Sequence, residues 1–388
     1  MTDASSPRRL RILHVFRAPL GGLFRHVLDV ARGQAERGHA VGIFCDSTTG
    51  SSRTVEQFRG LADQLELGLT RVPMSRYPNA TDAAAQWSEI TLCRRLKPDV
   101  VHCHGSKGGV YGRFPALISP RRRYVTAYTP HGGSFNYKPG TFEHKLYMGV
   151  ERLLEGATDS FLFESRFIAD RFEAYIGHKP RNAHRVVLNG ISDAEFEPID
   201  HSGAKFDLLY LGELRSAKGV DTLIEALALL RRRDGLTPRI LIVGSGPDEA
   251  ELRQMTLEHG VAEQCVFEPP APIRKALAQA RIMVLPSRAE SLPYVILEAA
   301  AAAQPLVSTD VGGISEILGP RHRHRLIKAN DPTILADAIG AMLATPEAER
   351  RAQAIDLAAN VREHFRLDSM VDSVLTAYRE ALQARGLR

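Results

Sequence analysis

The sequence has few cysteines and no long apolar run. Its four cysteines, Cys45, Cys93, Cys103 and Cys265, show no paired spacing, which argues against both a disulfide framework and a zinc site. No stretch approaches the ~18 to 20 consecutive apolar residues that a membrane-spanning helix needs. The stretch before Arg17 has too few apolar residues for a signal peptide. We therefore expect a cytoplasmic protein with reduced cysteines.

The two halves of the chain differ in charge. The 388 residues are enough for two domains of ordinary size, each with its own core. Residues 1–190 hold 27 Lys and Arg against 17 Asp and Glu, whereas residues 191–388 hold 23 against 28. A basic first half is typical of proteins that meet an anionic membrane or nucleic acid, and a merely solvated surface is the alternative.

Short apolar runs of strand length alternate with helix-forming segments along most of the chain. The runs cover residues 10–16, 40–45, 69–73, 100–104, 124–129, 160–163, 206–212, 239–243, 265–267 and 282–285. A helix is predicted between the second and third runs, over residues 55–67. Because signals for hairpin turns are scarce, the alternation predicts parallel sheets covered by helices on both faces. We expect two doubly wound α/β domains, residues 1–190 and 191–365.

The stretch over residues 281–318 contains a strand, a loop and a helix that opens with Pro293 in its first turn. Glu290 lies in the loop, and Glu298 falls about one and a half turns into the helix. A helix start favours an anion such as phosphate, and carboxylates beside it would bind hydroxyl groups. This layout predicts a nucleotide sugar as ligand. A solvated helix face is the alternative for such a carboxylate pair taken alone.

A second loop before a helix carries two basic residues. Arg215 and Lys218 can both reach a diphosphate, the arginine through its planar fork and the lysine as a point charge. A solvated basic loop is the alternative. The later turn with Gly244 and Gly246 has Glu249 where a dinucleotide fingerprint needs a third glycine, so the sequence does not predict a dehydrogenase.

Glycines and histidines follow strands in the first half. Gly21 and Gly22 stand between a strand and a helix, an order typical of phosphate-binding loops and also of plain turns. His102 and His104 share one face of a strand, but no third metal ligand lies nearby in sequence, which argues against a metal site. His131 follows a strand end, where a parallel sheet has its ligand crevice, so we expect it to reach substrate. A histidine bonded to backbone is the alternative.

These motifs together resemble those of the family 4 glycosyltransferases of the GT-B architecture. The resemblance is carried by Glu290, Glu298, Pro305 and the Gly312–Gly313 loop, and it covers nearly the whole chain. It implies two Rossmann-like domains that face a central cleft, the first on the acceptor side and the second binding the nucleotide sugar. It also implies that the C-terminal helix, within residues 366–388, returns to the first domain.

The resemblance implies a retaining hexosyltransferase. The donor would be a nucleoside diphosphate sugar of the UDP or GDP type, and the acceptor a saccharide or lipid-linked molecule in polysaccharide or lipopolysaccharide synthesis. The implied catalytic residues are Glu290, His131, Arg215 and Lys218. The implied donor-binding residues are Gly21, Gly22, Arg215, Lys218, Leu292, Tyr294, Val295 and Glu298. Phosphate contacts fall to the neighbours of Pro293 because proline has no N–H group.

The sequence predicts neither a metal nor a cofactor. No Asp-x-Asp pair occurs, which is the usual metal ligand of the other major glycosyltransferase fold. Arg215, Lys218 and the helix start can neutralise a leaving diphosphate instead. Two other functions stay open. A nucleotide-sugar epimerase would need an acid and a base on opposite sides of the sugar, and a non-catalytic binding protein would have lost the cationic pair or the carboxylates.

The basic residues of the first half predict a partner other than the nucleotide. Lys107, Arg113 and residues 121–123 are the residues we expect to form a basic surface. Such a surface would hold the protein at the inner face of an anionic membrane, near a lipid-linked acceptor. Nucleic acid is not expected, because no aromatic stacking platform accompanies these residues.

Overall fold

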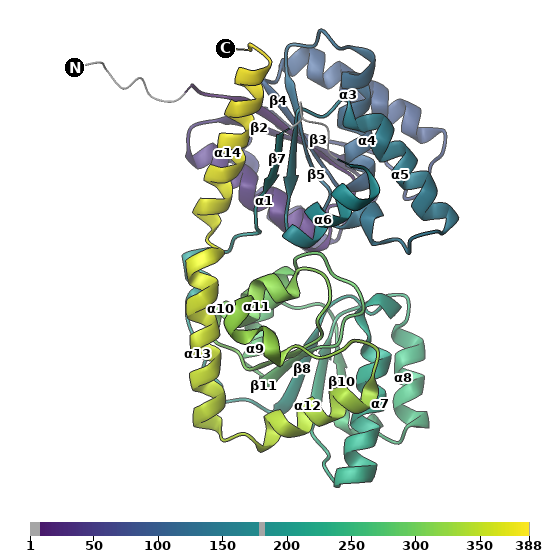
Figure 1. Ribbon diagram of the computed structural model, residues 1–388, viewed down its shortest axis with the longest axis vertical. Helices are drawn as coiled ribbons and strands as arrows, with labels where there is room; N and C mark the ends of the chain where they lie inside the picture. Colours follow the sequence, from purple (N-terminus) through teal and green to yellow (C-terminus); the bar gives the residue numbers. More distant parts are fainter. Residues whose placement is uncertain (1–7, 178–182, 388) are drawn as a thin grey trace, which may run out of the picture. The chain divides into compact units, whose positions relative to one another are not determined.

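The computed structural model describes residues 8–177 and 183–387, and these form two compact units (Figure 1). The first unit comprises Met1–Gly190 with Leu367–Arg388, and the second comprises Ile191–Arg366. Residues 1–7, the start of the stretch considered for a signal peptide, lie outside the described residues. Within the described ranges, no helix combines the length and the apolarity needed to cross a membrane.

The first unit is built on a parallel sheet with the strand order β3-β2-β1-β4-β5-β6-β7. Its strands are β1 (Arg11–Phe16), β2 (Ala40–Asp46), β3 (Gly68–Val72), β4 (Val100–His104), β5 (Val125–Thr129), β6 (Ser160–Phe163) and β7 (Ala183–Val186). The order reverses between β1 and β4, which lie side by side. In a doubly wound sheet, the carboxyl ends of the strands at such a reversal form the ligand crevice.

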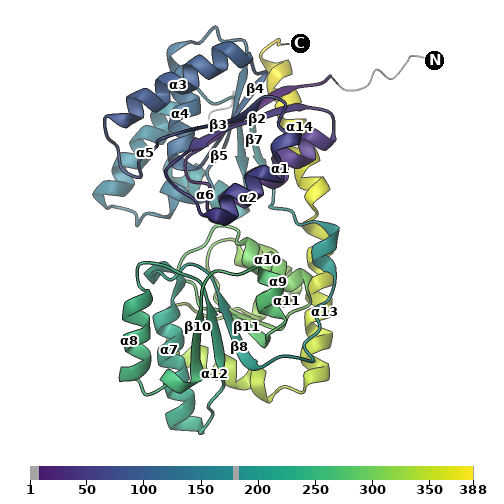
Figure 2. The same cartoon turned by 180° about the vertical axis from the view of Figure 1, so that it is seen from behind.

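Helices cover both faces of this sheet (Figures 1 and 2). They are α1 (Gly21–Glu36), α2 (Ser52–Arg59), α3 (Thr81–Leu96), α4 (Gly105–Ile118), α5 (Phe142–Glu155), α6 (Arg166–Tyr175) and α14 (Leu367–Ala384). Alternate residues of the strands face opposite helix layers. Ile12 and Val100 belong to the core cluster that includes α14, whereas Leu13 and Val101 belong to the cluster on the other side.

The C-terminal helix α14 packs on α1 and on the sheet of the first unit. Val371 and Tyr378 are fully buried in it. A Cβ added to Gly33 of α1 would lie 2.7 Å from a methyl group of Val371, so the two helices are in close contact. The last described helix of the chain is therefore part of the same core as the first strands.

Glycines allow α4 to lie directly on the sheet. A Cβ at Gly108 would lie 2.6 Å from the Cα of Phe16, and one at Gly112 would lie 2.4 Å from the Sγ of Cys103. The sequence prediction omits this helix because glycine is a poor helix former. The signal was present, since glycines 105, 108, 109 and 112 follow the spacing of a single helix face.

The second unit has a smaller parallel sheet with the strand order β10-β9-β8-β11-β12. Its strands are β8 (Phe206–Leu211), β9 (Ile240–Val243), β10 (Cys265–Glu268), β11 (Ala280–Leu285) and β12 (Leu306–Ser308). Its helices are α7 (Val220–Leu229), α8 (Glu249–Glu258), α9 (Ile273–Leu277), α10 (Tyr294–Ala301), α11 (Ile314–His322), α12 (Pro332–Ala344) and α13 (Glu347–His364). The strand order reverses between β8 and β11.

Two local predictions are wrong, and a short strand was missed. The helix expected over residues 55–67 is the shorter α2 followed by a 3-10 turn, Ala62–Gln64, because Gly60 ends α2. The strand β12 was not predicted, since its three residues give almost no periodic signal. Pro293 precedes α10 as its N-cap residue and is not part of the first turn.

Candidate active site

Two loops meet where the strand order of the second unit reverses. One loop joins β8 to α7 and carries Lys218, and the other joins β11 to α10 and carries Glu290. The Lys218 Nζ donates a hydrogen bond of 2.7 Å to Glu290 Oε1. The Ser287 hydroxyl donates to the same oxygen, also at 2.7 Å. The structure thus brings together two residues that the sequence singled out 72 positions apart.

Glycines force these loops into contact. Gly219 has φ +68°, and a Cβ there would lie 2.1 Å from the carbonyl oxygen of Pro286. Gly312 has φ +62°, and a Cβ there would lie 2.2 Å from the carbonyl oxygen of Glu290. Both distances are far below a van der Waals contact, and the left-handed φ disfavours side chains as well. The position of Glu290 therefore depends on two glycines from other loops.

Arg288 fixes the same loops, and the sequence prediction did not select it. Its guanidinium donates to the carbonyl oxygen of Ser216 and to Asp221 Oδ2, both at 2.6 Å. It also donates to Asn330 Oδ1 at 2.8 Å. Arg288 thus ties the loop that carries Lys218 to the loop that carries Glu290. Its neighbour Ser287, which holds the Glu290 carboxylate, was missed too, because neither residue type is specific in sequence.

Arg215 is exposed at the edge of this arrangement. Its guanidinium forms an ion pair of 2.8 Å with Glu213, a neighbour in the same loop. Both side chains are about half exposed, with 45% and 56% of their surface accessible. Such a pair is worth at most about 1 kcal/mol, so an incoming anion can take Arg215 away from Glu213 at little cost.

The predicted donor-binding residues follow Glu290 along the chain. Leu292 and Tyr294 have buried side chains, so only their backbone can meet a ligand, as the prediction assumed. Val295 is half-buried at the start of α10, and Glu298 is half-buried one turn further along that helix. All four lie on the same loop-to-helix junction as Glu290.

The glycines of the turn after β9 serve packing. A Cβ at Gly244 would lie 1.9 Å from the carbonyl oxygen of Gly212, and one at Gly246 would lie 2.1 Å from that of Leu214. The turn therefore presses on the loop that follows β8. This contact gives the two glycines a structural reason that needs no dinucleotide.

In the first unit, histidines gather at the reversal between β1 and β4. The cluster, called here the histidine cluster, consists of His14, His26, His102, His104 and His131. A hydrogen bond of 3.0 Å joins His14 Nδ1 to His104 Nε2, and one of 3.1 Å joins His104 Nδ1 to His131 Nε2. The sequence has no third metal ligand near His102 and His104, but the fold brings three other histidines to them. Strand β1 contributes His14, helix α1 contributes His26, and the loop after β5 contributes His131.

Polar side chains surround the cluster. His14 Nε2 meets Gln34 Oε1 at 2.9 Å. His102 is bonded through both ring nitrogens, to the Tyr378 hydroxyl at 2.6 Å and to the Thr129 hydroxyl at 2.9 Å. Gln34 Nε2 donates to the Tyr378 hydroxyl at 3.3 Å. The C-terminal helix thus contributes to the cluster through Tyr378.

Burial keeps these histidines neutral. Desolvation lowers the pKa of His14 and that of His26 to about 4. It also lowers the pKa of His102, His104 and His131 well below the ordinary value. A neutral imidazole has one N–H donor and one lone pair, so the hydrogen bonds determine which nitrogen carries the proton.

The loop after β5 holds His131 in an unusual backbone conformation. His131 has φ +54°, and Gly132 and Gly133 that follow also have positive φ. Non-glycine residues seldom adopt such angles, and they concentrate at functional sites. The ring nitrogen Nε2 bonds to His104, whereas the alternative from sequence was a bond to backbone.

Gly21 and Gly22 are the first two residues of α1 and are exposed. Gly21 has φ +63°, and no atom lies within 4 Å of the place where its Cβ would be. The residue before them, Leu20, gives α1 no side-chain cap. The start of α1 is thus open to a ligand.

The predicted basic surface is largely wrong. Arg113 is completely buried and forms an ion pair of 2.7 Å with Glu151. Arg122 is buried and pairs with Asp159, also at 2.7 Å. Lys107 is held by Asp82 at the same distance. Of the predicted set, arginines 121 and 123 remain exposed. The sequence shows which residues are basic, but it does not show which of them are neutralised by an acidic partner in the folded protein.

Two family models match the chain. The model described as Glycosyltransferase Family 4 matches residues 20–195, and the one described as Glycosyl transferases group 1 matches residues 192–360. The chain belongs to the family 4 glycosyltransferases. The predicted family and the predicted enzyme class, a hexosyltransferase, are thereby confirmed.

Curated relatives align with most of the length of this glycosyltransferase. A protein named D-inositol 3-phosphate glycosyltransferase 1, from Catenulispora acidiphila, is 28% identical over 98% of this chain and 97% of its own. A Bacillus subtilis protein named putative teichuronic acid biosynthesis glycosyltransferase TuaC is 30% identical over 63% of this chain and 61% of its own.

Solved structures confirm the predicted GT-B fold. Anabaena Alr3699/HepE, solved in complex with UDP and glucose, superposes with a TM-score of 0.77 at 16% identity. The match covers 96% of the glycosyltransferase chain and 100% of the Anabaena chain. At 16% identity, this similarity shows a shared fold and nothing more specific.

Proposed function

We propose that this glycosyltransferase moves a hexosyl group, with retention, from a nucleoside diphosphate sugar of the UDP or GDP type to a saccharide or lipid-linked acceptor. The observation that carries the donor assignment is the contact between Lys218 and Glu290 at the strand reversal of the second unit. A cation and a carboxylate side by side suit a ligand that combines phosphate with sugar hydroxyls. The UDP and glucose bound to the Anabaena protein support the same class of donor.

Lys218 and Arg215 are proposed to stabilise the diphosphate as it leaves. Negative charge on the leaving group grows toward the transition state, so fixed cations lower the barrier more than they strengthen ground-state binding. In the structure, each cation is paired with a carboxylate, Lys218 with Glu290 and Arg215 with Glu213. These partners keep the cations in place until a diphosphate competes for them. We propose that transfer needs no metal ion.

The carboxylates are proposed to bind hydroxyl groups. Glu298 would hold the ribose, and Glu290 the transferred sugar, because a carboxylate accepts two hydroxyl hydrogen bonds at once. His131 and the glycines 21 and 22 keep the roles that the family resemblance implies, near the transferred sugar and the diphosphate. The open start of α1 supports the role of the glycines.

A membrane surface remains the proposed location of the acceptor, but a different surface carries the proposal. Helix α5 exposes Phe142, Leu146 and Leu153, with 75%, 53% and 61% of their surfaces accessible. These positions share one helix face, and Lys145 and Arg152 are exposed beside them. Apolar residues flanked by basic ones suit the interface of an anionic leaflet. We propose that this face of α5 docks on the inner face of the membrane during polysaccharide or lipopolysaccharide synthesis.

A donor screen tests the proposed function. Nucleoside diphosphates are first ranked by thermal stabilisation, since a ligand at 100 times its Kd adds about 2.7 kcal/mol to stability. The sugar forms of the best base are then incubated with and without acceptors, including D-inositol 3-phosphate and polysaccharide fragments. Transfer in the presence of EDTA supports the proposal. Conversion of the donor alone would indicate an epimerase, and binding without turnover under every condition would indicate a binding protein.

A further inference from the structure

Among the residues that the structure describes, two overlapping sets of three histidines lie close enough to share a metal ion. In each set, one ring nitrogen per residue lies within 4.8 Å of the other two. The first set is His14, His102 and His104, and the second is His26, His104 and His131. The hydrogen bonds decide between them, because a metal needs a lone pair from every ligand.

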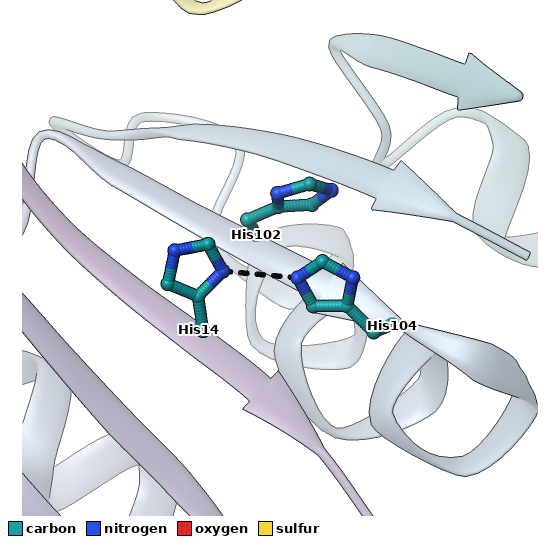
Figure 3. Close-up of side chains that lie close together, drawn as sticks. All are labelled: His14, His102 and His104. Atoms are coloured by element: carbon teal, nitrogen blue, oxygen red, sulfur yellow. Dashed lines mark hydrogen bonds between the residues drawn. The ribbon is translucent and has the colours of Figure 1, made fainter. Parts of the chain in front are cut away.

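Two residues of the first set, His14 and His102, have no lone pair to spare. Figure 3 shows its three rings, with His14 and His104 joined by their hydrogen bond. His14 uses its second nitrogen on Gln34. Both nitrogens of His102 are taken, by the Tyr378 and Thr129 hydroxyls. A metal here would have to break several buried hydrogen bonds without replacing them.

The hydrogen bonds of Gln34 determine which ring nitrogens carry a proton near the second set. Because the Gln34 amide donates to Tyr378, its oxygen accepts from His14 Nε2–H. Neutral His14 therefore accepts at Nδ1, so His104 donates through Nε2 and has its lone pair on Nδ1. That lone pair faces His131 Nε2 at 3.1 Å.

His26 supplies the third lone pair. Its Nδ1 faces Asn189 Oδ1 at 3.0 Å and must carry the proton, because the amide oxygen only accepts. The lone pair is then on Nε2, a buried atom that has no hydrogen-bond partner. A buried polar atom without a partner costs about 1 to 3 kcal/mol, so some compensation is expected. The His26 ring packs edge-on against the His131 ring, with centroids 4.7 Å apart.

We propose that His26 Nε2, His104 Nδ1 and His131 Nε2 form a binding site for a divalent transition metal, of which Zn²⁺ is the best match. Three imidazoles with one open position are a common zinc environment. His131 is partly accessible, so water can fill the fourth position. The role of these residues in sugar transfer is a separate proposal, and the metal site does not depend on it.

The geometry is close to what zinc requires. With Zn–N bonds of about 2.0 to 2.1 Å, tetrahedral ligands lie about 3.3 Å apart. The His104 and His131 nitrogens are already 3.1 Å apart. One nitrogen of the His26 ring lies within 4.8 Å of a nitrogen on each of the other two rings, so a rotation or shift of the His26 ring is enough to complete the site. His131 must shift its proton from Nε2 to Nδ1, a change of tautomer that alters no charge.

The surrounding hydrogen bonds also match a metal site. Ligating histidines usually donate their other N–H to an acceptor, which fixes the ring and its tautomer. His26 donates to Asn189, and His104 donates to His14, which in turn donates to Gln34. Metal binding also requires neutral imidazoles, and burial already lowers the pKa of all three ligands. Two of the three ligands, His26 and His104, therefore already have the tautomer that a metal needs.

Occupation of this site has a consequence for transfer. A metal on His131 Nε2 fixes a side chain that the proposed function places near the transferred sugar. Zinc is then expected to inhibit an enzyme that needs no metal for catalysis. This consequence, unlike the site itself, rests on the proposed function.

The test uses the full-length protein, freed of metal by a chelator and then titrated with ZnCl₂ in a calorimeter. Co²⁺ in place of zinc should give the strong visible absorption of a low-coordinate site. His26→Asn keeps an amide donor for Asn189 but removes the Nε2 ligand, and His324→Asn, at an exposed histidine of the second unit, is the matched control. Far-UV circular dichroism and thermal unfolding check that both variants fold.

We expect one zinc per chain, with the Kd raised by more than about 100-fold in His26→Asn, since even an outer-shell partner is worth about 10- to 100-fold. His324→Asn should leave the Kd unchanged. Absence of binding, or a Kd that His26→Asn does not change, overturns the site and leaves the proposed function standing. If zinc binds at the site and transfer continues at the same rate, the site stands and the proposed role of His131 falls.

Discussion

Glu89 makes the stability of the first unit depend on pH. This residue of α3 is fully buried, and its carboxyl oxygens accept from the Cys93 thiol at 3.0 Å and from Gln86 Nε2 at 3.3 Å. Neither donor carries a charge. Burial raises the pKa of Glu89 from 4.5 to about 7. We predict that Glu89→Gln, which mimics the protonated acid, removes this dependence.

The sign and size follow from the raised pKa. Between pH 4.5 and 7, the folded protein holds a proton on Glu89 that the unfolded chain has lost. The free energy of unfolding therefore falls as pH rises through this window and levels off above it. Each pH unit costs about 1.4 kcal/mol, so the whole window costs about 3 kcal/mol. Below pH 4.5 both states are protonated and the effect vanishes.

Urea unfolding from pH 4.5 to 8 measures this effect. The sole tryptophan, Trp87, lies on α3, so its fluorescence follows the first unit. Other titrating groups are common to both proteins, so they cancel in the difference between Glu89→Gln and the parent. That difference should grow in favour of the variant by about 3 kcal/mol across the window. Glu56→Gln, at an exposed acid of α2, is the control. Parallel pH curves for Glu89→Gln and the parent would refute the reasoning.

Three further predictions concern function. Changing Arg215 and Lys218 together to Ala should lower kcat more than it weakens binding of the nucleoside diphosphate, and an unchanged kcat would contradict the electrostatic role. Glu298→Ala should weaken that binding by about 1.5 to 3 kcal/mol per lost hydrogen bond, measured by calorimetry, and unchanged affinity would rule out the ribose assignment. Changing Phe142 and Leu146 to Ser should abolish sedimentation with anionic vesicles at low salt, whereas Val55→Ser on α2 should not, and equal sedimentation of both variants would exclude docking through α5.

The parallel two-sheet fold could be predicted because its signal is local. Apolar runs such as Ile240–Val243 and Ser160–Phe163 stand between recognisable helices, and burial on both faces leaves few polar interruptions. Helix α4 escaped prediction because its glycines contradict helix propensity and serve a contact with the sheet. Tertiary packing overrides the low helix propensity of glycine there, and the contact that explains the glycines exists only once the sheet has formed.

Some residues of the candidate site could likewise be predicted from the sequence, whereas the contacts between them could not. Glu290 and Glu298 could be selected because they belong to one contiguous motif, but the Lys218 contact and the Arg288 clamp join separate loops. The histidine cluster depends on the order of strands, which brings together residues 14 and 104. The charge of Arg113 is visible in sequence, whereas its burial against Glu151 is not.

The place of α14 in the first unit has a consequence for synthesis on the ribosome. Val371, Val374 and Tyr378 complete a core whose other members begin at Leu10. The first unit therefore lacks part of its interior until the last residues have left the ribosome, whereas the second unit is one continuous segment, Ile191–Arg366. Domains usually fold from the N-terminus onward as the chain emerges. Here the segment made second can finish folding first, and a nascent chain that stops before α14 leaves the apolar face of β1 and β4 without its cover.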